Sequence, residues 1–143
     1  MTSDEIRAFI TRFVELWEKD DARGLAACYA EHAHVDSPMF HGIDGREAVE
    51  KSFVDLFKAM ADSKISIEDL IIDTETGDRV VTVFTSQSTH KGMLFGLPGT
   101  GRRVEIRGAF VMKFAAGLIV SELRLYDFVG LLVQLGVLKT KAV

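Results

Sequence analysis

The chain has 143 residues, the usual length of one domain, and it carries a formal net charge of −4 with 48% hydrophobic residues. Nucleic-acid binding needs clustered lysine and arginine side chains, and the sequence has no basic stripe. It also has no basic and apolar leader and no apolar run long enough to span a membrane. Its single cysteine, Cys28, cannot form an internal disulfide. We therefore expect a single domain over residues 1–143 in the cytoplasm, with no nucleic-acid or membrane partner.

Helical patterns dominate the first half of the chain. Thr2 and Glu5 have the spacing of a capping box, and the apolar positions that follow recur every three or four residues, which predicts a first helix. A short second helix is predicted over residues 21–30, a brief strand over residues 34–39, and a third helix that Asp44 caps. The inner stripe of the third helix would consist of Val49, Phe53, Leu56, Phe57 and Met60.

Extended patterns dominate the second half. Four segments, at residues 65–72, 80–90, 104–114 and 118–128, are separated by turn residues. Alternation in the third segment places Gly108 and Phe110 on one apolar face, and a glycine in mid-strand often marks a bend. Helices followed by a meander predict an α+β fold, in which a curved antiparallel or mixed sheet wraps around three helices and forms a cone-shaped pocket.

The last predicted strand ends in a carboxylate, Asp127. Because residues two apart share a face of a strand, the inward face would carry Ile119, Leu123, Leu125 and Asp127, and the outward face Glu122, Arg124 and Tyr126. Loss of hydration raises the pKa of a carboxyl group toward the range that suits a general base or acid, so Asp127 is the first catalytic candidate. The alternative is that Asp127 caps a short C-terminal helix.

Many aromatic residues lie on the predicted inner faces, where they could line the pocket. Core packing is the alternative for most of them, because aromatic residues at helical spacing usually fill a core. The predicted lining residues are Phe13, Trp17, Tyr29, Ser37, Phe53, Phe57, Phe84, Phe110, Met112 and Leu125.

A series of short motifs follows the middle of the chain at fixed spacing. They are His90 with Gly92, Gly96, Pro98 with Thr100 and Gly101, Gly108, Gly117 with Ile119, Glu122, Asp127, and the tail at residues 130–136. These motifs resemble the second half of the SnoaL-like polyketide cyclases. The order of the predicted elements is similar to that of the wider nuclear transport factor 2-like fold.

The resemblance implies a cyclase-type lyase or isomerase that acts on a small apolar carbonyl compound without a metal or cofactor. In that family an acidic residue on the last strand removes a proton next to a carbonyl, and by position it corresponds to Asp127. The enolate oxygen then needs a donor, for which His90 is the matched candidate; contacts with the neighbouring loop are its structural alternative. The segment at residues 104–114 lacks the histidine that the family cyclases carry there. The fold also implies a homodimer formed through the outer face of the sheet.

A binding or assembly module of the same fold, without catalysis, is the alternative function. Steroid isomerisation is excluded, because Phe13, Ser37 and Phe110 stand where ketosteroid isomerase has its catalytic tyrosine and two aspartates. A metal site is not expected either. His34 and Asp36 lie in a histidine-rich stretch, but alternation directs both side chains outward.

Overall fold

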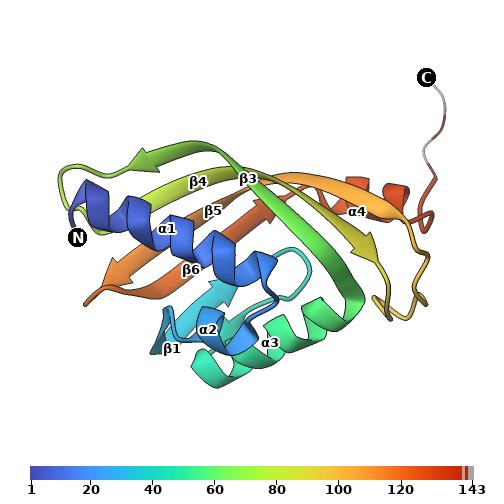
Figure 1. Ribbon diagram of the computed structural model, residues 1–143, viewed down its shortest axis with the longest axis horizontal. Coiled ribbons are helices and arrows are strands. Elements are labelled where there is room, and N and C mark those ends of the chain that lie inside the picture. Colours follow the sequence, from blue (N-terminus) through green and yellow to red (C-terminus); the bar gives the residue numbers. More distant parts are fainter. Residues whose placement is uncertain (140, 142–143) are drawn as a thin grey trace.

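Six strands form one curved sheet in the computed structural model of the chain, which describes residues 1–139 and 141 (Figure 1). The order across the sheet is β2 (Ile43–Asp44), β1 (Tyr29–Asp36), β6 (Leu118–Tyr126), β5 (Arg103–Ala115), β4 (Arg79–His90) and β3 (Met60–Ile72). β1 is parallel to β6, and the other neighbouring strands are antiparallel.

Three helices, α1 (Ser3–Glu18), α2 (Ala22–Ala26) and α3 (Arg46–Ala59), cover one face of the sheet, while α4 (Phe128–Gln134) lies beside β5 at the end far from the N-terminus (Figure 1). The predicted α+β architecture with a curved mixed sheet is confirmed. Within residues 1–139 and 141, no helix has both the length and the apolar character that crossing a membrane requires.

Helix α1 begins at the predicted capping box. The Thr2 hydroxyl accepts from the Glu5 amide at 3.1 Å, and the Glu5 carboxylate accepts from the Thr2 amide at 2.8 Å. Helix α3 differs from the prediction at both ends. Its N-cap is Gly45, while the Asp44 carboxylate contacts the His34 ring at 2.6 Å, and the helix ends before Met60, which is the first residue of β3.

Aromatic side chains from the helices and the sheet form the centre of the core. The ring centroid of Phe13 in α1 lies 6.0 Å from that of Trp17, and 6.2 Å from those of Tyr29 and Phe110. A second, smaller cluster joins α4 to the sheet; its buried members are Ala59, Met60, Leu94, Val104, Leu131 and Leu135. Burial of large apolar side chains of this kind contributes about 1.5–3 kcal/mol each.

Strand β1 starts earlier than expected. The sequence pattern predicts a helix at residues 29 and 30, but Tyr29 is the first residue of β1 and pairs with Ile119 of β6. This parallel pairing joins segments about 90 residues apart in sequence, and local helix propensity carries no information about such a contact. The strand ends at Asp36, and residues 37–42 form a bent connection to β2.

Strand β6 contains one extra residue near its start. Lys113 of β5 pairs with Ser121, but the next residue, Phe114, pairs with Ile119, so Val120 is a β-bulge. One inserted residue reverses the facing of every side chain after it. The predicted inward face of this strand is therefore wrong: the inward residues after the bulge are Glu122, Arg124 and Tyr126, and the outward ones are Leu123 and Leu125.

Candidate functional site

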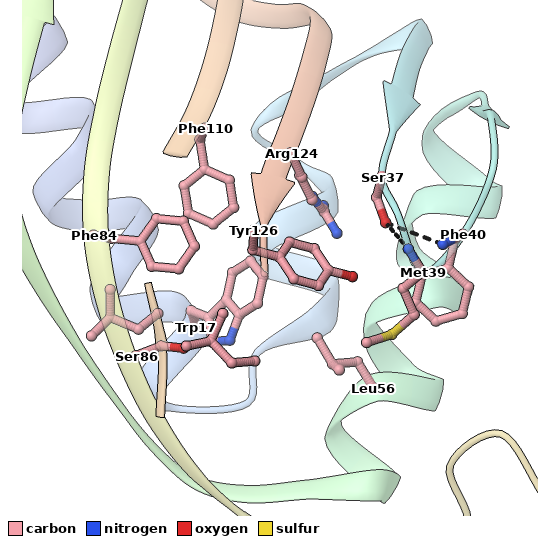
Figure 2. Close-up of a pocket in the computed structure, with 12 residues that line it drawn as sticks. Trp17, Ser37, Met39, Phe40, Leu56, Phe84, Ser86, Phe110, Arg124 and Tyr126 are labelled. Carbon is pink, nitrogen blue, oxygen red and sulfur yellow. Dashed lines mark hydrogen bonds between the residues drawn. The ribbon is translucent and has the colours of Figure 1, made fainter. Parts of the chain in front are cut away.

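A cavity of about 90 Å³ lies between the helices and the inner face of the sheet (Figure 2). Side chains from α1, α3, β3, β4, β5, β6 and the connection after β1 surround it, and its lining is mostly apolar. The lining residues are Trp17, Ser37, Met39, Phe40, Leu56, Ile65, Phe84, Ser86, Ile106, Phe110, Arg124 and Tyr126.

One wall of the cavity is aromatic. The rings of Phe84 and Phe110 are stacked with centroids 4.3 Å apart, and Phe110 lies 5.8 Å from Trp17. Gly108 permits this arrangement, because a Cβ atom there would lie 2.4 Å from the carbonyl oxygen of Leu125 and 3.2 Å from the Phe84 ring. The mid-strand glycine thus lets β5 and β6 approach closely at the cavity.

Three polar side chains form a buried network behind the cavity. The Arg124 Nε donates to one oxygen of the Glu122 carboxylate, and the Tyr29 hydroxyl donates to the other at 2.8 Å. The Arg124 Nη2 also donates to the Tyr29 hydroxyl oxygen at 3.3 Å. All three residues are at least 94% buried, since Arg124, the most exposed of them, is 6% accessible. The network fixes the position of the guanidinium, which also lies over the ring of Trp17 at 5.7 Å.

Burial and the neighbouring polar groups act on the pKa of Arg124 in opposite directions. Burial disfavours the charged guanidinium, but the neighbouring Glu122 carboxylate and Tyr29 outweigh that cost and raise the pKa of Arg124. Burial, reinforced by the charge of Glu122, raises the pKa of Tyr29 well above its ordinary value. Arg124 is therefore a permanent cation, and Tyr29 a neutral phenol, at neutral pH.

Free hydrogen-bond donors remain at the polar end of the cavity. The Nη1 of Arg124 donates to no residue that the structure describes. Burial raises the pKa of Tyr126, with partial opposition from Ser37, Arg124 and the Met39 amide, so this side chain is also a neutral phenol. Figure 2 shows the Arg124 guanidinium and the Tyr126 hydroxyl pointing toward the same space, opposite Ser37.

Asp127 lies outside this cavity. It is the N-cap of α4, where its carboxylate accepts from the Gly130 amide at 2.8 Å, and its side chain is exposed on the outer face of the sheet. Gly130 leaves room for this contact, because a Cβ atom there would lie 2.2 Å from a carboxylate oxygen of Asp127. The prediction that Asp127 points into the core is wrong, because the β-bulge reversed the strand; the capping alternative is the observed one.

His90 is completely buried at the end of β4, outside the lining of the cavity. Its Nδ1 accepts from the Thr100 amide at 3.2 Å, which leaves Nε2 as the ring nitrogen that can donate. That Nε2 has no partner among the residues that the structure describes. The loop therefore provides a hydrogen-bond partner for one of the two ring nitrogens. The role of His90 as a donor to an enolate stays a prediction.

The family model of the SnoaL-like polyketide cyclases matches residues 7–135 of the chain. The chain belongs to this family. Solved structures with the same fold include TsrD from Streptomyces laurentii, at 22% identity and a TM-score of 0.84 with 96% of this chain and 99% of that one covered. Another is AclR from Streptomyces galilaeus, described as a candidate hydroxylase, at 23% identity and a TM-score of 0.84 with coverage of 99% and 91%.

A third solved structure names the fold directly. It is a protein from Catenulispora acidiphila described as having a ketosteroid isomerase-like fold, at 15% identity and a TM-score of 0.75 with 93% of this chain and 97% of that one covered. At these identities the three structures show the fold alone, and they confirm its nuclear transport factor 2-like class. The chain matches no curated protein.

The residues predicted to line the pocket of this SnoaL-like protein fall into three groups. Trp17, Ser37, Phe84 and Phe110 line the cavity. Leu125 is 49% exposed on the outer face, for the same reason as Asp127. The others, Phe13, Tyr29, Phe53, Phe57 and Met112, are buried in the core.

Sequence reasoning missed Arg124 and Tyr126, the two polar residues of the last strand that reach the cavity. Strict alternation placed both outside, and a one-residue bulge leaves no mark in composition. The useful signal was the apolar inward face of β5, which was predicted correctly. Once β5 and β6 are paired, Phe110 lies opposite Arg124, and the inward face of β6 follows.

Proposed function

We propose that this SnoaL-like protein is a cyclase-type lyase or isomerase that binds a small apolar carbonyl compound in the cavity. The observation that supports this is the convergence of two donors, Arg124 and Tyr126, at one end of an otherwise apolar site. Donors fixed in a dry site stabilise the negative charge that develops on a carbonyl oxygen when a neighbouring carbon loses its proton. The aromatic wall would hold the apolar part of the ligand.

The proposed reaction begins with the carbonyl oxygen bound between the Nη1 of Arg124 and the Tyr126 hydroxyl. A water molecule in the cavity accepts a proton from the carbon next to that carbonyl, and the electron pair of the C–H bond forms the enolate. The enolate carbon then attacks a second carbonyl carbon of the same molecule, so that a C–C bond forms. The proton returns from water to the new alkoxide, and no atom is gained or lost.

Water has the role of base in this scheme because the carboxylates are engaged elsewhere. Among the described residues, no carboxylate lines the cavity. Glu122 faces inward, but both its oxygens accept from Arg124 and Tyr29. Asp127 caps α4 on the outer face, so we propose a structural role for it in place of the predicted catalytic one.

A binding module without turnover is the second candidate, and the engagement of Glu122 favours it. The two candidates differ in what happens to a bound ketone. Cyclohexanone in D₂O exchanges its acidic hydrogens slowly, and proton magnetic resonance follows that exchange directly. The enzyme proposal predicts faster exchange with the protein than in buffer alone, whereas binding that changes Trp17 fluorescence without faster exchange would establish the binding module.

We also propose a homodimer that pairs through the outer face of the sheet. Register places six apolar residues in two adjacent rows of this face, and we call them the outer apolar patch: Val81, Val83, Ala109, Val111, Leu123 and Leu125. Leu123 and Leu125 are 39% and 49% exposed. Contiguous apolar patches on a soluble protein commonly mark an interface, and a second copy of the chain would cover this one.

A further inference from the structure

An exposed apolar surface lies at the end of the molecule far from the N-terminus, where the loop between β4 and β5 meets α4 and the segment after it (Figure 1). The ring centroids of Phe95 and Phe128 lie 5.4 Å apart in an edge-to-face contact, and Arg102 donates to the Gln134 carbonyl oxygen at 3.1 Å. These contacts join residues 91–103 and 128–139 into one surface, which we call the loop-tail surface. Its exposed apolar side chains, each 42% to 64% accessible, are Met93, Phe95, Val129, Val137 and Leu138.

Phe95 stands at the tip of this surface in a position that rarely holds a large side chain. Leu94 and Leu97 exchange backbone hydrogen bonds of 3.0 and 2.8 Å, and the two residues between them, Phe95 and Gly96, have φ angles of 51° and 73°. Two positive φ angles are typical of a type I′ turn, whose central positions favour glycine, asparagine and aspartate. The Phe95 ring is still 47% exposed despite its contact with Phe128. Packing within the chain therefore does not explain an aromatic residue at this tip.

The two segments that form the loop-tail surface are positively charged. They carry Lys91, Arg102, Arg103 and Lys139 and no aspartate or glutamate, although the whole chain has a net charge of −4. Arg102 and Arg103 donate to backbone carbonyl oxygens, of Gln134 and Asp62, which leaves their positive charge in place. Exposed apolar side chains bordered by lysine and arginine are typical of proteins that bind an anionic membrane surface.

The loop-tail surface also lies close to the cavity. Beneath it, Leu94, Leu131 and Leu135 belong to the small buried cluster that joins α4 to the sheet. Met39, Leu56 and Ile106 pack against this cluster and also line the cavity. One apolar layer thus separates the cavity from the loop-tail surface, and an apolar compound dissolved in a membrane would meet the protein at this end.

We propose that the loop-tail surface docks on an anionic lipid membrane, with Met93 and Phe95 inserted among the headgroups and Arg103 and Lys139 near lipid phosphates. The tight turn favours lipid over a protein partner, because aromatic anchors at protein interfaces fill pockets and Phe95 projects from a tip. The expectation of no membrane partner came from the lack of a spanning run, which surface docking does not need. The proposal does not depend on the reaction in the cavity.

Co-sedimentation of the full chain with lipid vesicles tests this proposal. The vesicles contain equal parts of phosphatidylcholine and phosphatidylglycerol, and vesicles of phosphatidylcholine alone are the comparison. We expect the anionic vesicles to bind the protein at least about tenfold more strongly, and added salt to weaken that binding. No binding to the anionic vesicles, or equal binding to both kinds, would overturn the proposal.

A variant of the turn tests the apolar contact. Met93→Ser is combined with Phe95→Asn, because asparagine tolerates a positive φ and should leave the turn folded, as the thermal transition would confirm. We expect this double variant to bind anionic vesicles about tenfold more weakly. Ile71→Ser, at a 55% exposed position of β3 outside the surface, is the control and should bind like the wild type. Unchanged binding of the double variant would contradict the proposal.

A second pair of substitutions tests the cations. Arg103→Gln combined with Lys139→Gln should weaken binding about 25-fold, because each cation near an anionic surface contributes about a factor of five. Arg7→Gln combined with Lys51→Gln, at exposed positions of α1 and α3, should leave binding unchanged. Soluble poly-L-glutamate tests an acidic protein as the partner. If it binds through Arg103 and Lys139 while the anionic vesicles do not bind, the membrane proposal is wrong.

Discussion

Glu122 and Arg124 stand two residues apart on β6, and both side chains point into the protein, where the guanidinium donates to the carboxylate. Because the Ile119 side chain points inward, regular alternation would point the side chains of Glu122 and Arg124 outward. The bulge at Val120 reverses this alternation. The bulge thus places an ion pair behind a small apolar cavity and leaves one arm of Arg124 free to face a ligand.

Loss of the arginine from this pair should strongly destabilise the fold. Arg124→Gln leaves a buried carboxylate with one partner fewer, and we expect the free energy of unfolding to fall by about 3–5 kcal/mol in urea denaturation. The double variant with Glu122→Gln should lose less, because no unpaired charge remains. Equal losses in the single and the double variant would show that the charges are not coupled. Arg107→Gln, in an exposed pair with Glu68, serves as the control and should change stability little.

Both tyrosines of the chain should resist ionisation in the native protein. Burial raises the pKa of Tyr29 well above its ordinary value, and it raises that of Tyr126 as well. The ultraviolet absorbance of phenolate should therefore stay low as the native protein passes pH 10, and rise when the protein unfolds. A full equivalent of tyrosine that titrates near pH 10 without unfolding would contradict the buried network.

The raised pKa of Tyr29 makes the free energy of unfolding depend on pH. Above pH 10 the unfolded chain loses the Tyr29 proton while the native state keeps it, so the unfolded state binds fewer protons and the free energy of unfolding falls as pH rises. The slope from this one group is about 1.4 kcal/mol per pH unit. Denaturant titrations between pH 8 and pH 11 measure it, and Tyr29→Phe should remove it.

Asp127 should stabilise the fold as the N-cap of α4. Asp127→Ala removes the acceptor for the Gly130 amide, and we expect a loss of about 0.5–2 kcal/mol in the free energy of unfolding. Asp127→Asn keeps a capping oxygen and should be nearly neutral. If Asp127→Asn instead raised stability strongly, the carboxylate would be a strained group and the capping role insufficient.

The outer apolar patch should hold the proposed homodimer together. Leu123→Glu places a charge in the patch and should convert the proposed dimer to a monomer in sedimentation equilibrium. Met93→Glu, at a 64% exposed loop position outside the patch, is the matched control and should leave the mass unchanged. A wild-type protein that sediments as a monomer at all concentrations would contradict the proposal.

Local patterns in the sequence predict much of this fold. The capping box at Thr2, the inner face of α1 and the inward face of β5 all follow from spacing, because each depends on neighbouring residues only. The aromatic lining from Trp17 and Phe84 follows from the same patterns.

The features that spacing missed depend on contacts across the chain. The pairing of Tyr29 with Ile119 sets the start of β1, and the pairing of Phe114 with Ile119 creates the bulge in β6. Neither partner is visible from the local sequence. For that reason the polar end of the cavity, where Arg124 lies, could not be assigned before the strands were paired.

We propose that the polar end of the cavity, and not the carboxylate of Asp127, acts on the ligand. The rate of deuterium exchange into cyclohexanone, measured with the Tyr126→Phe and Asp127→Asn variants, distinguishes the two. We predict that Tyr126→Phe, which removes one oxyanion donor, slows the catalysed exchange by about 100-fold, while Asp127→Asn leaves it close to the wild-type rate. Loss of exchange in Asp127→Asn together with a normal rate in Tyr126→Phe would instead assign the chemistry to Asp127.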